Sequence, residues 1–158
     1  MDTRRDYMKY QTGDMEMFQR SREYVDTVII PLNAITFEKG VNQAVASYEY
    51  LSLLTYELER ELKGRIFLAH PVPYMKESGQ EFKNGLLSQW REFYREAGFT
   101  YIRFLTTDNK WLSAANQEEI LWFPSIQTDK MPKEAIKQVL DDHTEQITEL
   151  LREAWNTD

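Results

Sequence analysis

The chain has 158 residues, of which 42% are hydrophobic and 13% aromatic, so it can bury a sizeable core and is not a wholly disordered chain. Its formal net charge of -7 argues against a broad phosphate-binding surface, and we expect no nucleic-acid partner. It contains no cysteine, which excludes disulfides, thiolate metal sites and thiol catalysis within the chain.

The N-terminal stretch carries charges but no apolar segment of the kind found in signal peptides. No apolar run approaches the roughly 18 residues that a membrane span requires. We therefore expect a cytoplasmic protein with no membrane partner. We expect residues 1–12 to form a loose lead-in and residues 13–158 to form a single α/β domain.

The first predicted helix and strand follow this lead-in directly. Asp14 can cap a helix that runs to about Tyr24. The apolar run from Val25 to Leu32 does not alternate with polar residues, which predicts a strand covered on both faces in a parallel sheet. Pro31 lacks a backbone donor, so we expect the strand to weaken there and residues 31–40 to form a loop.

The clearest helical pattern runs from Val41 to Leu62. Apolar residues recur there at steps of three and four: Val41, Ala44, Val45, Tyr48, Leu51, Leu54, Leu58 and Leu62. Gly64 stands where a left-handed cap would end this helix. Residues 65–69 predict a second short strand, and residues 70–74, with two prolines, predict an extended exit from it.

The helix that follows the second predicted strand begins after residue 77. Ser78 and Glu81 form a Ser-x-x-Glu capping box, which predicts the start of a helix. Its apolar face is predicted to contain Phe82, Leu86, Trp90, Phe93 and Ala97. Gly98 ends this helix, and residues 99–105 predict a third strand in which Arg103 is the polar exception.

The last part of the chain contains one weak and two clear patterns. Residues 106–119 carry the weakest signal, with a short helix predicted from Ser113. Residues 120–124 predict a fourth strand. A terminal helix after Pro132 is marked by Ile136, Val139, Leu140, His143, Ile147, Leu150, Leu151 and Trp155.

This alternation of strands and helices predicts an α/β fold. We expect a small three-layer sandwich of about four mainly parallel strands, Rossmann- or flavodoxin-like but without the glycine-rich loop. A strand order of 2-1-3-4 would place the first strand centrally. The sequence contains no internal repeat and no low-complexity tract.

Four stretches of the chain resemble the YpiF-like family of small proteins from spore-forming Gram-positive bacteria and their relatives. They are residues 14–32, which include the phrase Arg-Glu-Tyr-Val-Asp-Thr, and residues 53–68, 104–108 and 121–124. The resemblance covers most of the chain in the same order. It implies a cytoplasmic location and supplies no assigned activity, so it carries no catalytic residues over to this chain.

The predicted carboxyl ends of the strands supply a candidate ligand site, because open α/β sheets bind ligands at this edge. The polar residues there are Asn33, His70, Tyr74, Thr106, Thr107, Asp108 and Ser125, with Trp111 and Trp122 as aromatic walls. Such groups could perform acid–base chemistry or hold a small polar ligand. The competing interpretation is structural, because the turns that follow strands favour these same residue types.

Specific cofactor and metal signatures are absent from the sequence. No Gly-x-Gly-x-x-Gly follows the first strand, and neither a Walker A loop nor a Gly-x-Ser-x-Gly elbow occurs. Two histidines without cysteine do not make a usual zinc site, so we expect no cofactor and no metal. We interpret His143 as a hydrogen-bonded, partly buried residue of the terminal helix. Its neighbours Asp141 and Asp142 point to other sides of that helix.

Two functions therefore remain open. The first is a non-enzymatic module for protein–protein contact, with an unknown protein partner that could be a second copy. Its basis is the surplus of aromatic residues on predicted helices: Tyr48, Tyr50, Tyr56, Trp90, Phe93, Tyr94 and Trp155. These residues could instead pack around both faces of the sheet. The second function is an enzyme or small-ligand binder that uses the polar residues at the strand ends.

Overall fold

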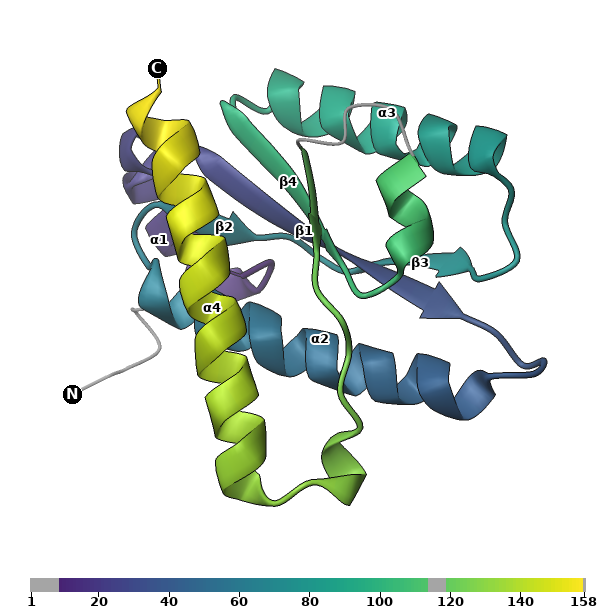
Figure 1. The fold of residues 1–158 in the computed structure, drawn as a ribbon. Coiled ribbons are helices and arrows are strands. Elements are labelled where there is room, and N and C mark those ends of the chain that lie inside the picture. Colours follow the sequence, from purple (N-terminus) through teal and green to yellow (C-terminus); the bar gives the residue numbers. More distant parts are fainter. Residues whose placement is uncertain (1–8, 114–118, 158) are drawn as a thin grey trace.

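A computed structural model describes residues 9–113 and 119–157 of the protein. Figure 1 shows a parallel sheet between layers of helices. The strands are β1 (Thr27–Ile35), β2 (Ile66–Leu68), β3 (Val72–Met75), β4 (Tyr101–Thr106) and β5 (Ile120–Trp122). The α-helices are α1 (Thr12–Arg20), α2 (Val41–Glu61), α3 (Gln80–Glu96) and α4 (Lys133–Asn156). Short 3-10 helices in these ranges span Arg22–Tyr24, Asn109–Ser113 and Thr128–Lys130.

The sheet confirms the predicted α/β class and strand order. Its order is β2-β1-β4-β5, with β3 as a further neighbour of β1, and every described pairing is parallel. In terms of the four predicted strands this is the order 2-1-3-4. The fifth strand, β3, forms from the segment that the sequence predicted only as an extended exit.

β1 is buried on both faces, as its apolar run predicts. Val28 and Ile30 belong to the core on the α3 side of the sheet, and Ile29 belongs to the core on the other side. All three side chains are fully inaccessible to solvent. Because its apolar residues do not alternate with polar ones, β1 contributes side chains to both cores.

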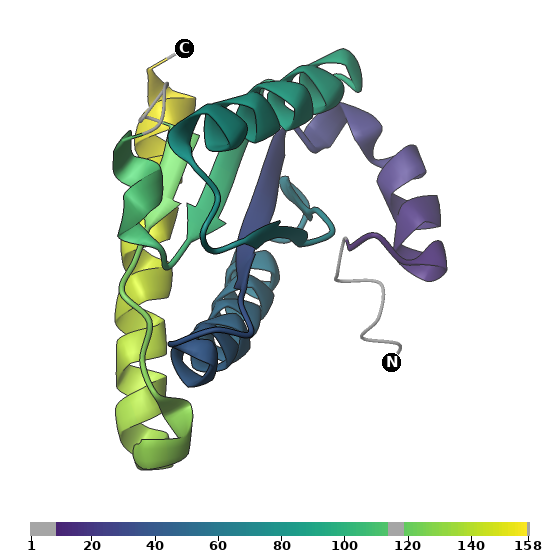
Figure 2. The ribbon, with the colours of Figure 1, turned by 90° about the vertical axis from the view of Figure 1, so that its right-hand side faces the viewer.

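Helices cover both faces of the sheet, which gives three layers (Figures 1 and 2). α1 and α3 lie over one face, where Phe18 and Leu87 join the core that contains Val28. α2 and α4 lie over the opposite face, where Leu54 and Ile147 join the core that contains Ile29. None of the helices in the described ranges is long and apolar enough to cross a membrane.

The prediction for Pro31 was wrong in part, because the chain does not turn there. β1 continues to Ile35 and changes its neighbour from β2 to β3. Ile29 pairs with Leu68 and Leu32 pairs with Val72, so three residues, 69–71, lie opposite two, 30 and 31. This is a bulge. Pro31, which has no N–H, lies opposite this break between β2 and β3. The missing donor therefore interrupts the hydrogen bonding of β1 at this point but does not end the strand.

A proline lies at the outer edge of the sheet beside this bulge. The Lys76 N–H donates to the Ile35 carbonyl at 2.9 Å, so the backbone groups of even-numbered residues of β3 face β1. Pro73 therefore faces away from β1. Proline is tolerated at such an edge because no sheet neighbour needs its N–H.

Both predicted N-terminal helix caps were wrong, whereas Gly64 and Gly98 have the positive φ expected of C-terminal caps. Ser78 and Glu81 do not form a capping box: α3 starts at Gln80, its N-cap is Gly79, and no side chain caps it. The Ser78 hydroxyl is buried without a hydrogen-bond partner among the described residues. Asp14 lies inside α1 and accepts a hydrogen bond from the backbone N–H of Lys9 at 3.3 Å.

The predicted apolar face of α3 was also displaced. Phe82 and Phe93 are exposed, whereas Lys83, Leu87 and Tyr94 are buried. Leu86 and Trp90 of the predicted face pack against the core as expected, so the buried face is turned from the predicted one by less than one residue, or less than 100° of helix rotation.

Two N-terminal or loop predictions concern residues beyond the described part of the chain. The short helix predicted from Ser113 falls mostly on residues 114–118, which lie outside the described residues, and Ser113 itself ends the preceding 3-10 helix. Residues 1–8 of the predicted lead-in also lie outside. Lys9 forms a parallel bridge with Leu68 of β2, and Thr12 begins α1.

Candidate functional site

Three of the predicted site residues meet at the carboxyl ends of the strands. Tyr74 comes from β3, Thr106 is the last residue of β4, and Asp108 follows it by two residues. The Tyr74 hydroxyl donates to Asp108 Oδ2 at 2.7 Å. The backbone N–H groups of Asp108 and Lys110 donate to Thr106 Oγ1 and Asp108 Oδ1, each at 3.0 Å. The turn after β4 therefore fixes the carboxylate in place, and β3 supplies a phenol to it.

Sequence reasoning missed a fourth member, Lys83 of α3. It is only 2% exposed, and its Nζ lies 3.9 Å from Asp108 Oδ2. The ammonium also lies 5.1 Å from the ring centre of Trp111 and 5.9 Å from that of Tyr74. The spacing of Lys83 from Leu87 and Tyr94, four and eleven residues, was the available signal, because these positions share one face of a helix.

Burial perturbs the titration of both groups that face Asp108. It lowers the pKa of Lys83, while the charge of Asp108 opposes this shift and the charge of Lys110 adds to it. Burial also raises the pKa of Tyr74 well above its ordinary value; the neighbouring Trp111 indole opposes that shift, and Asp108 reinforces it. The raised pKa keeps the Tyr74 phenol protonated at neutral pH, so Lys83 is the group of this cluster that could release a proton or hold a small anion.

The predicted aromatic walls have different positions. Trp111, from the 3-10 helix after β4, is fully buried and meets Tyr74 edge to face, with ring centres 4.9 Å apart. Its indole N–H has no well-formed hydrogen bond within the described part of the chain. Trp122 is half-buried and donates its Nε1–H to the Thr107 carbonyl at 3.2 Å. Trp111 therefore fills the space behind the polar residues and closes the cluster.

The remaining predicted residues lie apart from this cluster. His70 is exposed, and its Nδ1 lies 3.0 Å from the Pro71 carbonyl oxygen. Asn33 is half-buried in β1. No hydrogen bond among the described residues joins either of them to Asp108. Ser125 is exposed, and its hydroxyl accepts a hydrogen bond from Ser47 at 3.1 Å.

The second histidine has the structural role expected from the sequence. His143 of α4 is partly buried, and the hydroxyl of Tyr50 of α2 forms a hydrogen bond with its Nδ1. Burial lowers the pKa of His143, an effect that the charge of Asp142 opposes. Within the described ranges, no three His, Asp or Glu side chains come together as metal ligands.

A different feature of the carboxyl edge is a group of exposed apolar side chains, which we call the edge patch. Its members and their exposed fractions are Ile35 (41%), Phe37 (91%), Val45 (50%), Tyr48 (45%) and Met75 (66%). Ile35 and Met75 are register partners at the ends of β1 and β3, so their side chains lie on the same face of the sheet.

α2 begins beside these strand ends, which adds Val45 and Tyr48 to the edge patch. A Cβ atom placed on Gly40, the N-cap of α2, would lie 3.0 Å from Lys76 Nζ, next to Met75. Figure 1 shows the same proximity of the start of α2 to the tip of β1. Surplus aromatic residues on the helices thus divide between surface and core: Tyr48, Tyr56 and Phe93 are exposed, whereas Tyr50 and Tyr94 are buried.

Comparison with known proteins gives two matches. The family described as "Protein of unknown function (DUF2487)" matches residues 16–155. "Uncharacterized protein YpiF" of Bacillus subtilis (strain 168) is 27% identical over 150 residues, which cover 95% of this chain and 99% of the relative. No solved structure matches this chain.

Proposed function

Since this chain belongs to the DUF2487 family, which has no described function, we propose from its structure alone that it is a non-enzymatic, cytoplasmic protein-interaction module. The resemblance to YpiF-like proteins expected from the sequence is confirmed by the same comparisons. The observation that carries the proposal is the edge patch. A group of exposed apolar side chains at one edge of the sheet, with Phe37 91% exposed, is typical of a surface that another protein covers.

The partner that best fits the edge patch is a second copy of this chain. The charged residues that flank its members Phe37 and Met75 in the sequence are Glu38, Lys39, Lys76 and Glu77, two acidic and two basic. The molecule carries a net charge of -7, so most of its surfaces would repel a second copy. Locally balanced charges remove this repulsion, and flanking charges of both signs can complement each other across a two-fold axis.

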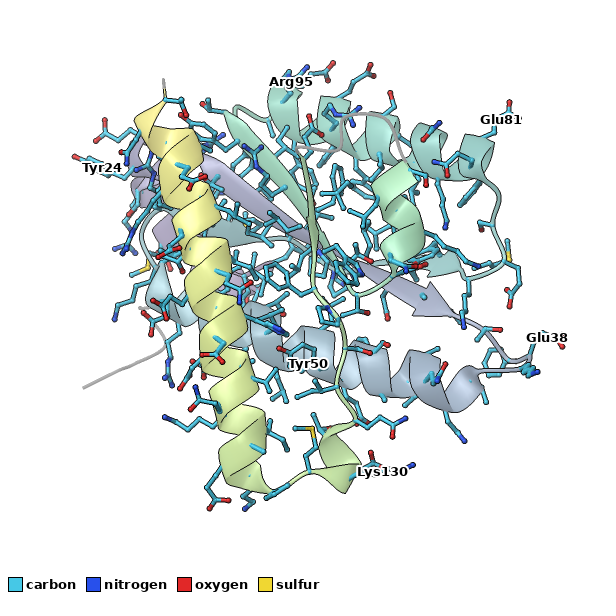
Figure 3. The ribbon with its side chains drawn as sticks, in the orientation of Figure 1. Tyr24, Glu38, Tyr50, Glu81, Arg95 and Lys130 are labelled. Carbon is cyan, nitrogen blue, oxygen red and sulfur yellow. The ribbon has the colours of Figure 1, made fainter. Side chains whose placement is uncertain are left out.

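Sedimentation velocity tests this function directly. We expect the protein to sediment as a dimer, and we expect the double substitution Phe37→Ser and Met75→Ser to convert it to a monomer, because both substitutions replace exposed apolar surface. Tyr24→Ser is the matched control: Tyr24 is 68% exposed and lies at the far end of the molecule from Glu38 (Figure 3). A wild-type protein that stays monomeric at all concentrations, and that retains no partner in pull-downs, would contradict the proposal.

The second candidate function, binding of a small anion at the carboxyl edge, is favoured by Lys83. The strand order supports this alternative, because a Rossmann-like sheet would place its ligand between the carboxyl ends of β1 and β4. Inorganic phosphate is a suitable probe in a thermal-shift assay. This alternative predicts that phosphate raises the melting temperature of the wild type and not that of Lys83→Met, with Lys137→Met as the exposed control. Equal shifts in all three proteins would exclude it.

A further inference from the structure

A groove between α2 and α4 lies apart from both surfaces described above. It is a half-open groove with a volume of about 530 Å³. Its walls are Glu57, Arg60 and Glu61 from α2 and Lys137, Asp141, Glu145, Glu149 and Arg152 from α4, with Leu140, Thr144 and Thr148 between them. The edge patch uses the first two turns of α2, whereas the groove uses its last two turns.

The charges of the groove are not balanced. Arg60 pairs with Glu57 at 3.4 Å, and Lys137 approaches Asp141 at 3.5 Å. Glu61, Glu145 and Glu149 remain; they are exposed and form no ion pair with any described residue. Among the residues that line the groove, Arg152 is the one cation left against these three carboxylates.

The two threonine hydroxyls in the groove are already engaged as donors within α4. The Thr144 hydroxyl donates to the Leu140 carbonyl at 2.7 Å, and the Thr148 hydroxyl donates to the Thr144 carbonyl at 2.8 Å. Both donors are thus used within α4, and their methyl groups join Leu140 as apolar surface. The hydrogen-bonding capacity of the groove therefore lies mainly with its carboxylates.

We propose that this groove binds a basic, extended peptide segment of another protein. Glu145 and Glu149 are four residues apart on α4, so their carboxylates stand about one helical turn, roughly 6 Å, apart. Alternate side chains of an extended peptide project to the same side at intervals of about 6.6 Å. Two Lys or Arg side chains at positions i and i+2 can therefore reach both glutamates, and Glu61 faces them from α2.

The composition of the groove favours a peptide over other cationic ligands. Arg60, Lys137 and Arg152 interrupt the acidic wall, which suits a partner that carries acceptors, such as backbone carbonyl groups, between its positive charges. A divalent ion would need several converging carboxylates, and the described residues contain no such group of three. The inference does not depend on the proposed self-association.

Fluorescence anisotropy with a labelled nonapeptide of alternating Lys and Ser tests the inference. We expect saturable binding at low salt. The double substitution Glu145→Gln and Glu149→Gln should weaken it at least tenfold, because it removes two of the three carboxylates without ion pairs. Glutamine has a helix propensity similar to that of glutamate, so α4 should persist, as circular dichroism can verify.

The matched control is Glu92→Gln together with Glu96→Gln. These exposed residues have the same spacing on α3, beyond the opposite face of the sheet, and their replacement changes the net charge equally. We expect less than a twofold effect. Equal weakening by both pairs would overturn the inference, because it would show attraction to overall charge only. Absence of wild-type binding, or equal binding of the lysine-acetylated peptide, would overturn it as well.

Discussion

The charged forms of Lys83 and Asp108 stabilise each other, because both side chains are largely shielded from water. Removal of one member of a buried ion pair leaves the other uncompensated, at a cost of roughly 3–5 kcal/mol. Asparagine in place of Asp108 keeps the size of the side chain and an acceptor for the Tyr74 hydroxyl. We therefore predict that Asp108→Asn lowers the free energy of unfolding by about 3 kcal/mol at pH 7, as urea denaturation would measure.

Asp129→Asn provides the control for this prediction. Asp129 is an exposed residue of the last 3-10 helix, so its replacement should change the free energy of unfolding by less than about 0.5 kcal/mol. Similar small effects for both substitutions would show that Lys83 gains little from the carboxylate at 3.9 Å.

His143 predicts a dependence of stability on pH. Burial lowers its pKa in the folded state below the ordinary value of 6.5. The unfolded chain therefore binds a proton at this residue first as the pH falls, which favours unfolding. We predict that the free energy of unfolding decreases between pH 7.5 and pH 5.5, and that His143→Gln reduces this decrease.

Glutamine at position 143 can still accept the Tyr50 hydrogen bond, so the comparison isolates the proton. His70→Gln is the control, since His70 is exposed and lies outside the helices. Chemical denaturation across this pH range gives the slope for each protein. An unchanged slope in His143→Gln would assign the pH dependence to other groups.

At the scale of secondary-structure elements, the exits of α2 and α3 both use a glycine with positive φ but differ in their surroundings. Gly64 has φ 92°, and a Cβ added to it would point into open space, whereas a Cβ on Gly98, at φ 103°, would lie 2.5 Å from an Arg22 guanidinium nitrogen. That guanidinium group donates to the carbonyls of Val25 and Ala97. It therefore links the segment before β1 to the end of α3.

We predict that Gly64→Ala lowers the free energy of unfolding by about 1–2 kcal/mol, the cost of a left-handed backbone for an L-residue. Gly98→Ala should cost more, because the new methyl group must also displace Arg22. Thermal and urea denaturation of the two variants would measure the difference. Equal decreases in the free energy of unfolding would mean that Arg22 can move aside without destabilising the protein.

The elements show which patterns in the sequence are informative. The apolar runs predicted β1, β2, β4 and β5 because each is buried over most of its length. β3 was missed because it has only four residues and a proline among them, and its role depends on the register break opposite Pro31. The face of α3 was misplaced because Lys83 reads as polar, although its aliphatic stem and its ammonium are both buried.

Only those residues of the candidate site that lie at or just after the ends of strands could be predicted from the sequence. Thr106 and Asp108 follow a strand directly, and Tyr74 lies at the same edge, so the parallel sheet brings all three together. Lys83 comes from a helix face, which depends on helix rotation. His70 was an unsuited candidate because it falls within the bulge, where its side chain is exposed.

At the scale of the whole molecule, net charge predicts opposite salt effects for the two proposed contacts. Two copies with a charge of -7 repel each other, so screening should strengthen self-association through the edge patch. The basic peptide is attracted to the groove, so screening should weaken its binding. An increase from about 20 mM to about 500 mM NaCl shortens the Debye length several-fold and should separate the two effects.

Sedimentation and anisotropy at the two salt concentrations would check this prediction. We expect the dimer dissociation constant to fall and the peptide dissociation constant to rise at high salt. Salt effects of the same sign in both assays would contradict the division of the surface into a neutral patch and an acidic groove.

The proline at the outer edge of β3, Pro73, also has a consequence for how the protein folds. Parallel sheets depend on contacts between distant parts of the chain, so they form slowly and expose unpaired strands while they do. An exposed strand can recruit another unfinished chain through its backbone donors. Pro73 offers none on that side, so partly folded chains at high concentration should resist aggregation through this strand. Pro73→Thr would remove that protection and should lower the yield of refolding.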